Sequence, residues 1–335
     1  MSMNLVYLAK PIYGGWVSFT SHLSLKYNYP LYKVAKRHEL HSRSYGYGVE
    51  YRNVKAEDLA DLGTDNLIIT ALDKNYYEVL PLFYGAYLVI HDPTELKDKR
   101  LHEHLEYFNI ITIRKKVSNY LEEKFGINSI ENIHPFFPFK KTLSFSNKNP
   151  KEKSGAISIS RIDYDKHTEI ILEANKILEA EGKPKIEIYG KLNELYAYHK
   201  LRDYDFYSQY KGCFPKTFAD LEKLLIDKKF VVDMSAIKGD GGGTQYSFLE
   251  AWYLDCVLII SSKWIVMDCC SPKCSPDSGC LNGYNSIIVD NADELVEELD
   301  PAESAIRSYK KWANKVLQKH IIENDWDKSK LSSNV

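Results

Sequence analysis

The stretch GDGGGTQYSFLEAWYLDCVLIIS, residues 239–261, predicts a glycine-rich loop, then a helix, then a buried strand. A glycine run before a helix can hold a phosphate, because backbone N–H groups and the positive end of the helix dipole both favour an anion. The same alternation continues on both sides. Short apolar runs at 5–9, 66–71, 86–91, 110–113, 156–160, 185–189, 230–234 and 285–289 alternate with helical patterns. Strands that alternate with helices predict parallel α/β sheets.

Length and composition predict two such sheets. The 335 residues exceed one ordinary core, and 44% apolar residues can fill two. The stretch 140–154 is polar and basic and contains Pro150, so we expect a linker there. We therefore expect one Rossmann-like domain at 1–145, a second at 151–300, and helices at 301–328 that cross back to the first domain.

Charge is distributed unevenly along the chain. Residues 1–150 contain 19 Lys and Arg against 16 Asp and Glu, whereas residues 151–335 contain 25 against 30. This difference favours an anionic partner for the first half. No apolar run is long enough to span a bilayer, and no leader precedes the first strand, so we expect a cytoplasmic protein. We also expect a monomer.

Two short motifs could contact phosphate. Gly14-Gly15 follows the first strand and opens a helix, which suits close backbone approach, although a tight strand–helix turn explains it equally well. In the second half, Arg161 and Lys166 lie five residues apart in a turn that leaves a strand. Both cations can reach the carboxyl edge of a parallel sheet, where phosphates bind. Glu250, two turns into the helix after the glycine run, could reach the hydroxyls of a ribose.

These residues resemble the retaining nucleotide-sugar glycosyltransferases of the GT-B class. Ser160-Arg161 with Lys166 is similar to the family's GR-(x4)-K segment, and Leu249–Trp252 followed by Val257–Ser261 is similar to its LEA helix and strand. Val89–Asp92 and Lys116–Ile127 resemble elements of the first domain. The resemblance covers roughly residues 4–300. It implies a GT-B fold, with two Rossmann-like domains facing a cleft. The domain at 1–145 would bind the acceptor, and the domain at 151–300 would bind the nucleotide sugar.

The resemblance also implies a donor site. Arg161 and Lys166 would hold the diphosphate of a nucleotide sugar, such as a UDP-sugar, and Glu250 would bind its ribose. The family's first glutamate corresponds to Gly242 here, with Asp240 as a substitute, which leaves the identity of the sugar open. The donor-binding residues that we expect are Gly14, Gly15, Arg161, Lys166, Gly242, Gly243, Thr244, Gln245 and Glu250.

Transfer builds negative charge on the departing phosphates, so cations and backbone amides would supply most of the catalysis, without a required metal ion. His91 and Asp92 end a strand at the edge where an acceptor hydroxyl would lie, and we expect them to be catalytic with Arg161 and Lys166. The alternative for His91 is a buried histidine satisfied by backbone.

The acceptor is indicated by the segment 26–55, where seven Lys and Arg alternate with six tyrosines. Cations for phosphates and aromatic rings for bases are typical of nucleic-acid binding, although a solvated polar face explains the pattern nearly as well. His91-Asp92 and the basic residues after it also resemble phage DNA-base glycosyltransferases. That resemblance implies glucose, arabinose or a similar sugar transferred to hydroxymethylcytosine in bacteriophage DNA, and it places a viral protein in the host cytoplasm. The duplex-contacting residues that we expect are Lys33, Lys36, Arg37, Arg43, Lys97, Lys99, Arg100, Arg114, Lys115 and Lys116.

Two further alternatives remain open at this stage. The acceptor could be a glycan or lipopolysaccharide, or the protein could bind nucleotide sugars or nucleic acid without catalysis. Cys269, Cys270, Cys274 and Cys280 could form a zinc site, but their spacing is not that of paired CxxC motifs, and reduced thiols in a loop are the alternative.

Overall fold

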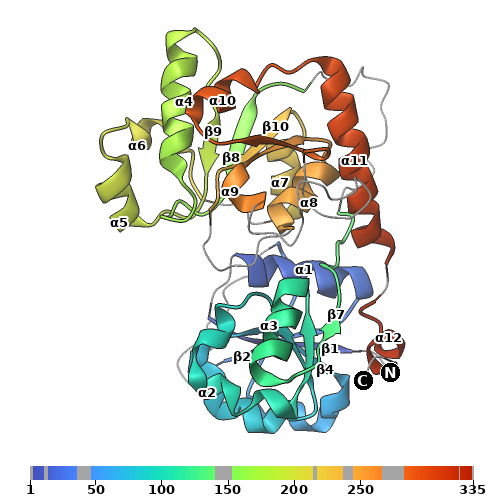
Figure 1. Ribbon diagram of the computed structural model, residues 1–335. Coiled ribbons are helices and arrows are strands. Elements are labelled where there is room, and N and C mark those ends of the chain that lie inside the picture. Colours follow the sequence, from blue (N-terminus) through green and yellow to red (C-terminus); the bar gives the residue numbers. More distant parts are fainter. Residues whose placement is uncertain are drawn as a thin grey trace. The chain divides into compact units, whose positions relative to one another are not determined.

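The computed structural model describes two compact α/β units (Figure 1). Unit 1 comprises Met1–Pro138 with His320–Val335, and unit 2 comprises Phe139–Lys319. The described residues are 3–10, 14–35, 47–139, 153–213, 217–236, 244–265, 283–323 and 325–333. Most of the expected linker, at 140–152, lies outside them.

Unit 1 contains a seven-stranded sheet in which all neighbouring strands are parallel, in the order β3-β2-β1-β4-β5-β6-β7. The strand order reverses between β1 and β4, which creates a topological switch point at the carboxyl edge. The strands are β1 Asn4–Leu8, β2 Leu31–Val34, β3 Arg52–Val54, β4 Leu67–Leu72, β5 Tyr87–Ile90, β6 Asn109–Thr112 and β7 Ile130–Glu131.

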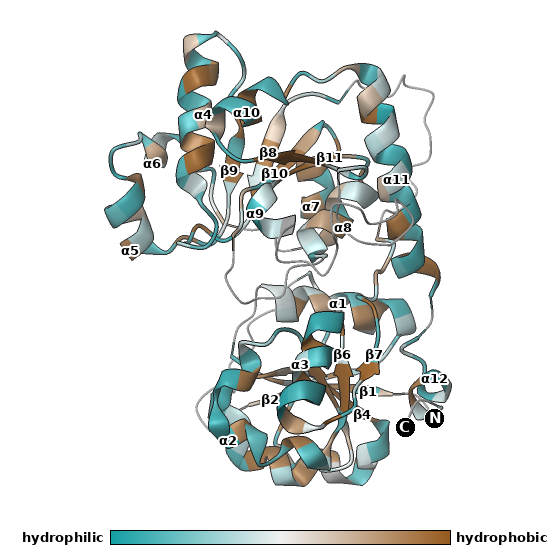
Figure 2. Ribbon diagram, in the orientation of Figure 1, coloured by the Kyte–Doolittle hydropathy of each residue, from teal (hydrophilic) through white to brown (hydrophobic). Residues whose placement is uncertain are grey.

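The central strands of unit 1 are buried on both faces, as expected of a parallel sheet covered by helices. Every residue of β4 and β5 is buried, and Figure 2 shows the strands as apolar elements among more polar helices. The α-helices of this unit are α1 Gly15–Tyr27, α2 Lys99–His102, α3 Lys115–Phe125 and α12 Lys328–Ser332. The 3₁₀ segments are η1 Glu57–Leu62, η2 Thr64–Asn66, η3 Lys74–Phe83, η4 Glu95–Lys97 and η5 Leu105–Tyr107.

Unit 2 contains a five-stranded parallel sheet in the order β12-β11-β10-β8-β9. Its switch point lies between β8 and β10. The strands are β8 Ala156–Ile159, β9 Glu187–Tyr189, β10 Phe230–Asp233, β11 Val257–Ser261 and β12 Ser286–Val289. The helices are α4 Thr168–Ala180, α5 Glu194–Tyr196, the π-helical η6 Ala197–Leu201, α6 Phe206–Gln209, α7 Phe218–Leu225, α8 Tyr246–Tyr253, α9 Ser262–Ile265, α10 Ala292–Glu297 and α11 Glu303–Ile322.

A buried asparagine attaches the first helix of unit 2 to its sheet. Asn175 on α4 donates from Nδ2 to the Ile186 carbonyl at 2.9 Å and accepts from the Ile186 N–H at 2.7 Å. A buried amide that satisfies both backbone groups of one residue avoids the cost of an unpaired polar group. This contact fixes α4 beside the start of β9.

The end of α11 and the residues after it belong to unit 1. Lys26 Nζ donates to the carbonyls of His320 and Glu323 at 2.9 and 2.7 Å. Trp326 is 1% exposed, and its Nε1 donates to the Ile133 carbonyl at 2.8 Å. The Lys26 ammonium satisfies carbonyl groups that a helix end leaves unpaired.

Some elements were absent from the sequence prediction. The strands β2, β3 and β7 are two to four residues long and carry polar or half-exposed positions, so they lack the apolar runs of β4 and β5. Each is held by parallel pairing with a neighbouring strand: β2 with β1, β3 with β2, and β7 with β6. The described residues contain no helix that is both long and apolar enough to cross a membrane.

Candidate functional site

The turn after β8 brings a buried lysine to the switch point of unit 2. Lys166 is 5% exposed, and its Nζ donates to Ser235 Oγ at 2.8 Å. Ser235 in turn donates from its backbone N–H to Asp233 Oδ1 at 2.9 Å, and its hydroxyl donates to the same oxygen. Asp233 ends β10, so the two strands on either side of the switch point meet through Lys166, Ser235 and Asp233. This is the position at which parallel α/β sheets bind ligands.

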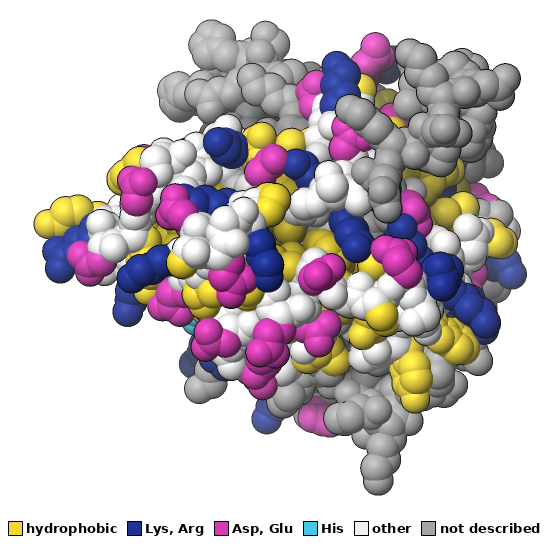
Figure 3. Space-filling model, turned by 90° about the horizontal axis from the view of Figure 1, so that it is seen from above, with side chains coloured by type: hydrophobic (Ala, Val, Ile, Leu, Met, Phe, Trp, Pro, Cys, Tyr) yellow, Lys and Arg dark blue, Asp and Glu magenta, His cyan; other side chains and the backbone are white. Residues whose placement is uncertain are grey.

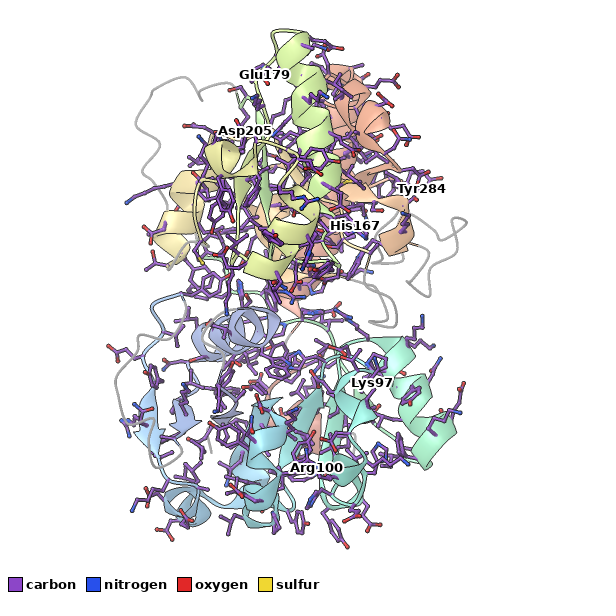
Figure 4. All side chains as sticks on the ribbon, turned by 90° about the vertical axis from the view of Figure 1, so that its left-hand side faces the viewer. Lys97, Arg100, His167, Glu179, Asp205 and Tyr284 are labelled. Atoms are coloured by element: carbon purple, nitrogen blue, oxygen red, sulfur yellow. The ribbon has the colours of Figure 1, made fainter. Side chains whose placement is uncertain are left out.

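The turn between β8 and α4 is also fixed by its backbone. The Ala236 N–H donates to the Asp165 carbonyl at 2.9 Å. His167, which is labelled in Figure 4, occupies the left-handed region at φ 49 where the turn enters α4. A non-glycine residue in this region costs about 1 kcal/mol or more, and such strain concentrates at functional sites.

A glycine next to the turn is required by its position. An ideal Cβ at Gly190, where β9 ends, would lie 1.7 Å from the Ser160 carbonyl oxygen. Gly190 has φ 158 and its carbonyl accepts from the Tyr210 hydroxyl at 2.8 Å. The backbone after β8 therefore approaches β9 more closely than any side chain allows.

Arg161 differs from Lys166 in its surroundings. Its side chain is 48% exposed, and its guanidinium contacts Asp163 at 3.3 Å and Asp165 at 3.0 Å. Asp163 also accepts from Asn193 Nδ2 at 2.9 Å. The sequence prediction placed both cations at the phosphate site. The structure places Lys166 in the switch point and holds Arg161 on the surface of the same turn by two carboxylates.

The third expected feature of this site is the helix with Glu250. Glu250 is 4% exposed on α8. Gln245 caps the helix with extended backbone and no side-chain cap hydrogen bond, and the first turn contains no acidic residue. Among the described residues, the buried Gln245 Nε2 has no hydrogen-bond partner. The helix start therefore presents donors and a positive dipole end, and the first turn of α8 places no carboxylate of its own there.

In unit 1, the carboxyl ends of β4 and β5 hold a compact polar cluster. His91 is buried, and its Nε2 makes a 2.8 Å hydrogen bond with the Thr70 carbonyl. Glu95 accepts from Trp16 Nε1 at 2.7 Å through Oε1 and from the His91 N–H at 3.1 Å through Oε2. Glu95 and Trp16 thus connect the expected catalytic pair to α1.

Electrostatics in this cluster favour neutral groups. Burial, reinforced by the neighbouring Asp92 carboxylate, raises the pKa of Glu95 to about 8. Burial also lowers the pKa of His91 to about 4. Both side chains are therefore uncharged at neutral pH, because their charged forms would lose hydration.

Asp92 differs from these two residues because it is partly exposed. Its Oδ1 accepts from the Thr94 N–H at 2.7 Å and from the Thr94 hydroxyl. Among the described residues, its Oδ2 has no hydrogen-bond partner, so this oxygen is the one that could meet a ligand.

The glycine pair near the N-terminus shows the geometry of a strand–helix turn. Gly14 has φ 103, caps α1, and accepts from the N–H groups of Val17 and Ser18 at 3.0 Å each. A Cβ at Gly14 or Gly15 would meet nothing within 4 Å, so open space surrounds both. The positive φ accounts for a glycine at position 14, whereas steric crowding does not account for glycine at either position.

The expected nucleic-acid contacts fall in several places on unit 1. Lys97, Lys99, Lys115 and Lys116 are exposed, Lys33 and Arg114 are partly buried, and Lys115 and Lys116 begin α3. Arg100 is exposed but pairs with Asp98 and lies 5.3 Å from the centroid of the Tyr77 ring. Lys97 and Arg100 are drawn apart in Figure 4.

Part of the prediction lies outside the described residues. This applies to Lys36, Arg37, Arg43, Asp240, Gly242, Gly243, Cys269, Cys270, Cys274 and Cys280. Within the described ranges, no three His, Cys, Asp or Glu side chains converge as a metal site would require.

Sequence reasoning missed Asp233, Ser235, Glu95 and Trp16. The hydrogen bond from Lys166 to Ser235 joins positions 69 residues apart, and the one from Trp16 to Glu95 joins positions 79 apart. Asp233 could have been found from its position in the sequence, because it lies in an apolar run in the same way that His91 follows one. Polar residues at the ends of parallel strands gather at one edge of the sheet.

The two parallel sheets with Rossmann-type strand orders are the GT-B fold of glycosyltransferases, and solved structures of that class match this chain. An alpha-glucosyltransferase in complex with UDP and a 13-mer DNA containing an HMU base matches with a TM-score of 0.68 and 13% identity, covering 100% of this chain and 98% of that one. Anabaena Alr3699/HepE in complex with UDP and glucose matches with a TM-score of 0.63 and 12% identity, over 99% and 98%.

A third solved structure covers less. A single-residue mutant of S. aureus TarM, in complex with fondaparinux, alpha-GlcNAc-glycerol and UDP, matches with a TM-score of 0.57 and 15% identity, over 83% of this chain and 56% of that one. No protein-family model and no curated protein sequence matches the chain. At these identities the likeness establishes the fold.

Proposed function

We propose that the protein is a glycosyltransferase that moves a sugar from a nucleotide diphosphate sugar, such as a UDP-sugar, to a hydroxyl acceptor. The observation that carries this proposal is the buried Lys166 ammonium at the switch point of unit 2. A buried cation is costly unless an anion compensates it. Among the described residues, the Asp233 carboxylate reaches Lys166 only through the Ser235 hydroxyl, and a diphosphate would supply a direct anionic partner. UDP is bound by the alpha-glucosyltransferase, HepE and TarM structures, which supports this donor.

Each residue of the donor site has a proposed role. Lys166 neutralises charge that develops on the diphosphate when the sugar leaves, and Arg161 adds a second cation when it exchanges Asp163 and Asp165 for phosphate oxygens. The amides of Thr244 and Gln245 bind a phosphate at the start of α8. Glu250 accepts hydrogen bonds from the ribose hydroxyls. Transfer with retention at the sugar carbon is part of the proposal.

We propose duplex DNA that contains hydroxymethylcytosine as the acceptor. The alpha-glucosyltransferase structure with DNA supports this choice, as do the exposed cations Lys97, Lys99, Lys115 and Lys116 on unit 1. Lys115 and Lys116 occupy the first turn of α3, where the helix dipole disfavours cations. A phosphate bound there would offset that repulsion.

Asp92 is the proposed contact to the acceptor hydroxyl. The carboxylate is partly exposed, and Thr94 occupies its Oδ1, so its Oδ2 can accept a hydrogen bond from the hydroxyl. His91 is neutral and packs against Thr70, so we assign it the positioning of this turn. The target base must leave the DNA stack to reach Asp92.

The deciding experiment is transfer itself. We would incubate the protein with hydroxymethylated or unmodified duplex DNA and a panel of nucleotide sugars, then measure nucleoside masses. A mass increase of one sugar, only with hydroxymethylated DNA, is the expected result. If transfer occurs only to glycans or lipopolysaccharide, the proposed DNA acceptor is wrong. If no donor gives turnover, the proposed glycosyltransferase activity is wrong.

A substitution then tests the acceptor contact. Asp92→Asn should lower the transfer rate by about a hundredfold while DNA affinity stays within about twofold, because the variant removes one charge-assisted hydrogen bond at the hydroxyl. Asp98→Asn is the matched control. Asp98 accepts from the Arg100 N–H at 3.1 Å, and asparagine can replace it at that helix start. Equal activity of both variants would exclude Asp92 from the site.

A further inference from the structure

Four cations form a regular stripe on the exposed face of α11. Arg307, Lys311, Lys315 and Lys319 are spaced four residues apart, and all four are exposed. The helix contains one acidic residue, Glu303, which lies before the stripe. We call these four residues the α11 stripe.

The spacing of the stripe suits a row of phosphates. An α-helix rises 1.5 Å per residue, so successive cations are about 6 Å apart and the stripe extends about 18 Å. Each step of four residues turns the helix by about 40°, so the stripe winds through about 120° from Arg307 to Lys319 and stays on the exposed third of the helix. Duplex DNA carries one charge per about 3.4 Å of axis on each strand, so the stripe covers about five phosphates of one strand.

Aromatic rings support the middle of the stripe. Lys311 Nζ and Lys315 Nζ lie 5.8 and 4.0 Å from the centroid of the Trp312 ring. Tyr284, which is 48% exposed, packs edge-on against Trp312 at 6.2 Å and is labelled in Figure 4. Contacts with an aromatic face restrict the lysine stems, so less freedom is lost when the ammonium groups meet an anion.

The apolar face of α11 is already occupied. Ile306, Ala313, Val316 and Leu317 are at most 4% exposed, and Ile306 belongs to the core of unit 2. Membrane-surface helices bind by inserting their apolar face, which this helix uses for packing. In Figure 3, several dark-blue Lys and Arg side chains lie toward the right-hand side of the molecule, among yellow, white and magenta ones.

We propose that the α11 stripe binds the phosphate backbone of duplex DNA as a sequence-independent contact in unit 2. The inference rests on the proposed DNA acceptor and adds a surface that the sequence prediction, confined to unit 1, did not include. The contact should contribute affinity and salt dependence without selecting a base.

The test neutralises the stripe in the full-length protein. The variant R307Q/K311Q/K315Q/K319Q keeps long side chains with good helix propensity. We would measure affinity for unmodified duplex DNA from about 50 to about 200 mM salt, because each lost phosphate contact removes about 0.9 from the log–log slope. Four contacts predict a slope that is shallower by about 3.6.

A matched control removes the same charge elsewhere in unit 2. Lys176, Lys183, Lys200 and Arg202 are also exposed, and K176Q/K183Q/K200Q/R202Q should change the slope by less than about 0.9. Binding of UDP and the thermal midpoint, measured on both variants, should stay at the wild-type values. These controls separate loss of the stripe from loss of fold or of overall charge.

Each outcome decides the inference. A slope shallower by about 1.8 or more in the stripe variant alone supports it, even if no sugar transfer is found and the proposed function fails. A smaller change in slope, or an equal change in the control variant, overturns the inference about the stripe but leaves sugar transfer to DNA possible. Absence of DNA binding by the wild-type protein overturns both. Binding to vesicles of phosphatidylserine and phosphatidylcholine that depends on the stripe, without a DNA effect, would assign it to a membrane surface instead.

Discussion

Lys166 and Arg161 should contribute unequally to donor binding, although they belong to one turn. The Lys166 ammonium is buried and donates to the neutral hydroxyl of Ser235. The Arg161 guanidinium is half exposed and paired with Asp163 and Asp165. The Lys166 ammonium is therefore already desolvated and positioned before a diphosphate binds. For the Arg161 guanidinium, a diphosphate would have to displace two carboxylates and water.

The magnitudes follow from these environments. A buried hydrogen bond to a charged group contributes about 1.5–3 kcal/mol, which is a factor of about 10 to 150 in the equilibrium constant. Exposed ion pairs contribute at most about 1 kcal/mol, or about fivefold. We therefore expect Lys166→Met to weaken UDP binding at least about tenfold and Arg161→Met by no more than about fivefold.

The assay is calorimetric titration with UDP, followed by kcat/KM for transfer. Lys176→Met, at an exposed position on α4, is the control for loss of one positive charge. Methionine preserves much of the side-chain volume, so the thermal midpoint reports whether Lys166→Met still folds. Equal losses in the two variants, or a larger loss for Arg161→Met, would refute the assignment of the buried cation as the main phosphate contact.

Three further predictions test the framework around the site. The folded wild-type protein, with a raised Glu95 pKa, binds more protons than the unfolded chain between about pH 4.5 and 8, so its free energy of unfolding should fall by up to about 1.4 kcal/mol per pH unit as the pH rises. Glu95→Gln should abolish this fall, because glutamine does not titrate. Urea titrations of both proteins across that range measure it. Gly190→Ala should destabilise unit 2 by about 3 kcal/mol, since its Cβ would collide with the Ser160 carbonyl, and should weaken UDP binding as the turn moves. Trp326→Ala should cost about 3–5 kcal/mol in urea unfolding, because it empties a buried site in unit 1.

Each of these three predictions has its own control or contrary result. A wild-type stability that rises with pH relative to Glu95→Gln would mean that the carboxyl is ionised in the folded protein. Gly182→Ala, where a Cβ would meet nothing within 4 Å, separates the strain of a positive φ from the collision at Gly190. Trp312→Ala, at a half-exposed position, should cost less than Trp326→Ala, and equal costs would contradict the docking of the C-terminal segment in unit 1.

Several features of the fold could be predicted from local patterns. The runs at 66–71 and 86–91 became β4 and β5, because strands buried on both faces need continuous apolar residues. Lys166 could be placed at a sheet edge because it follows a strand in a parallel α/β pattern. In contrast, β3 and β7 could not be predicted, because short polar strands form only where a neighbouring strand accepts their hydrogen bonds.

The sequence by itself determined the alternation of strands and helices, and therefore the parallel sheets and the edges at which His91 and Lys166 occur. It could not determine what those side chains contact. The partners of Lys166 and Glu95, 69 and 79 residues distant, were decided by the order of strands in each sheet. Tertiary structure also decided that Lys166 is buried while Arg161 remains exposed. Burial depends on neighbours that folding brings from distant positions, whereas periodicity depends only on residues nearby in the chain.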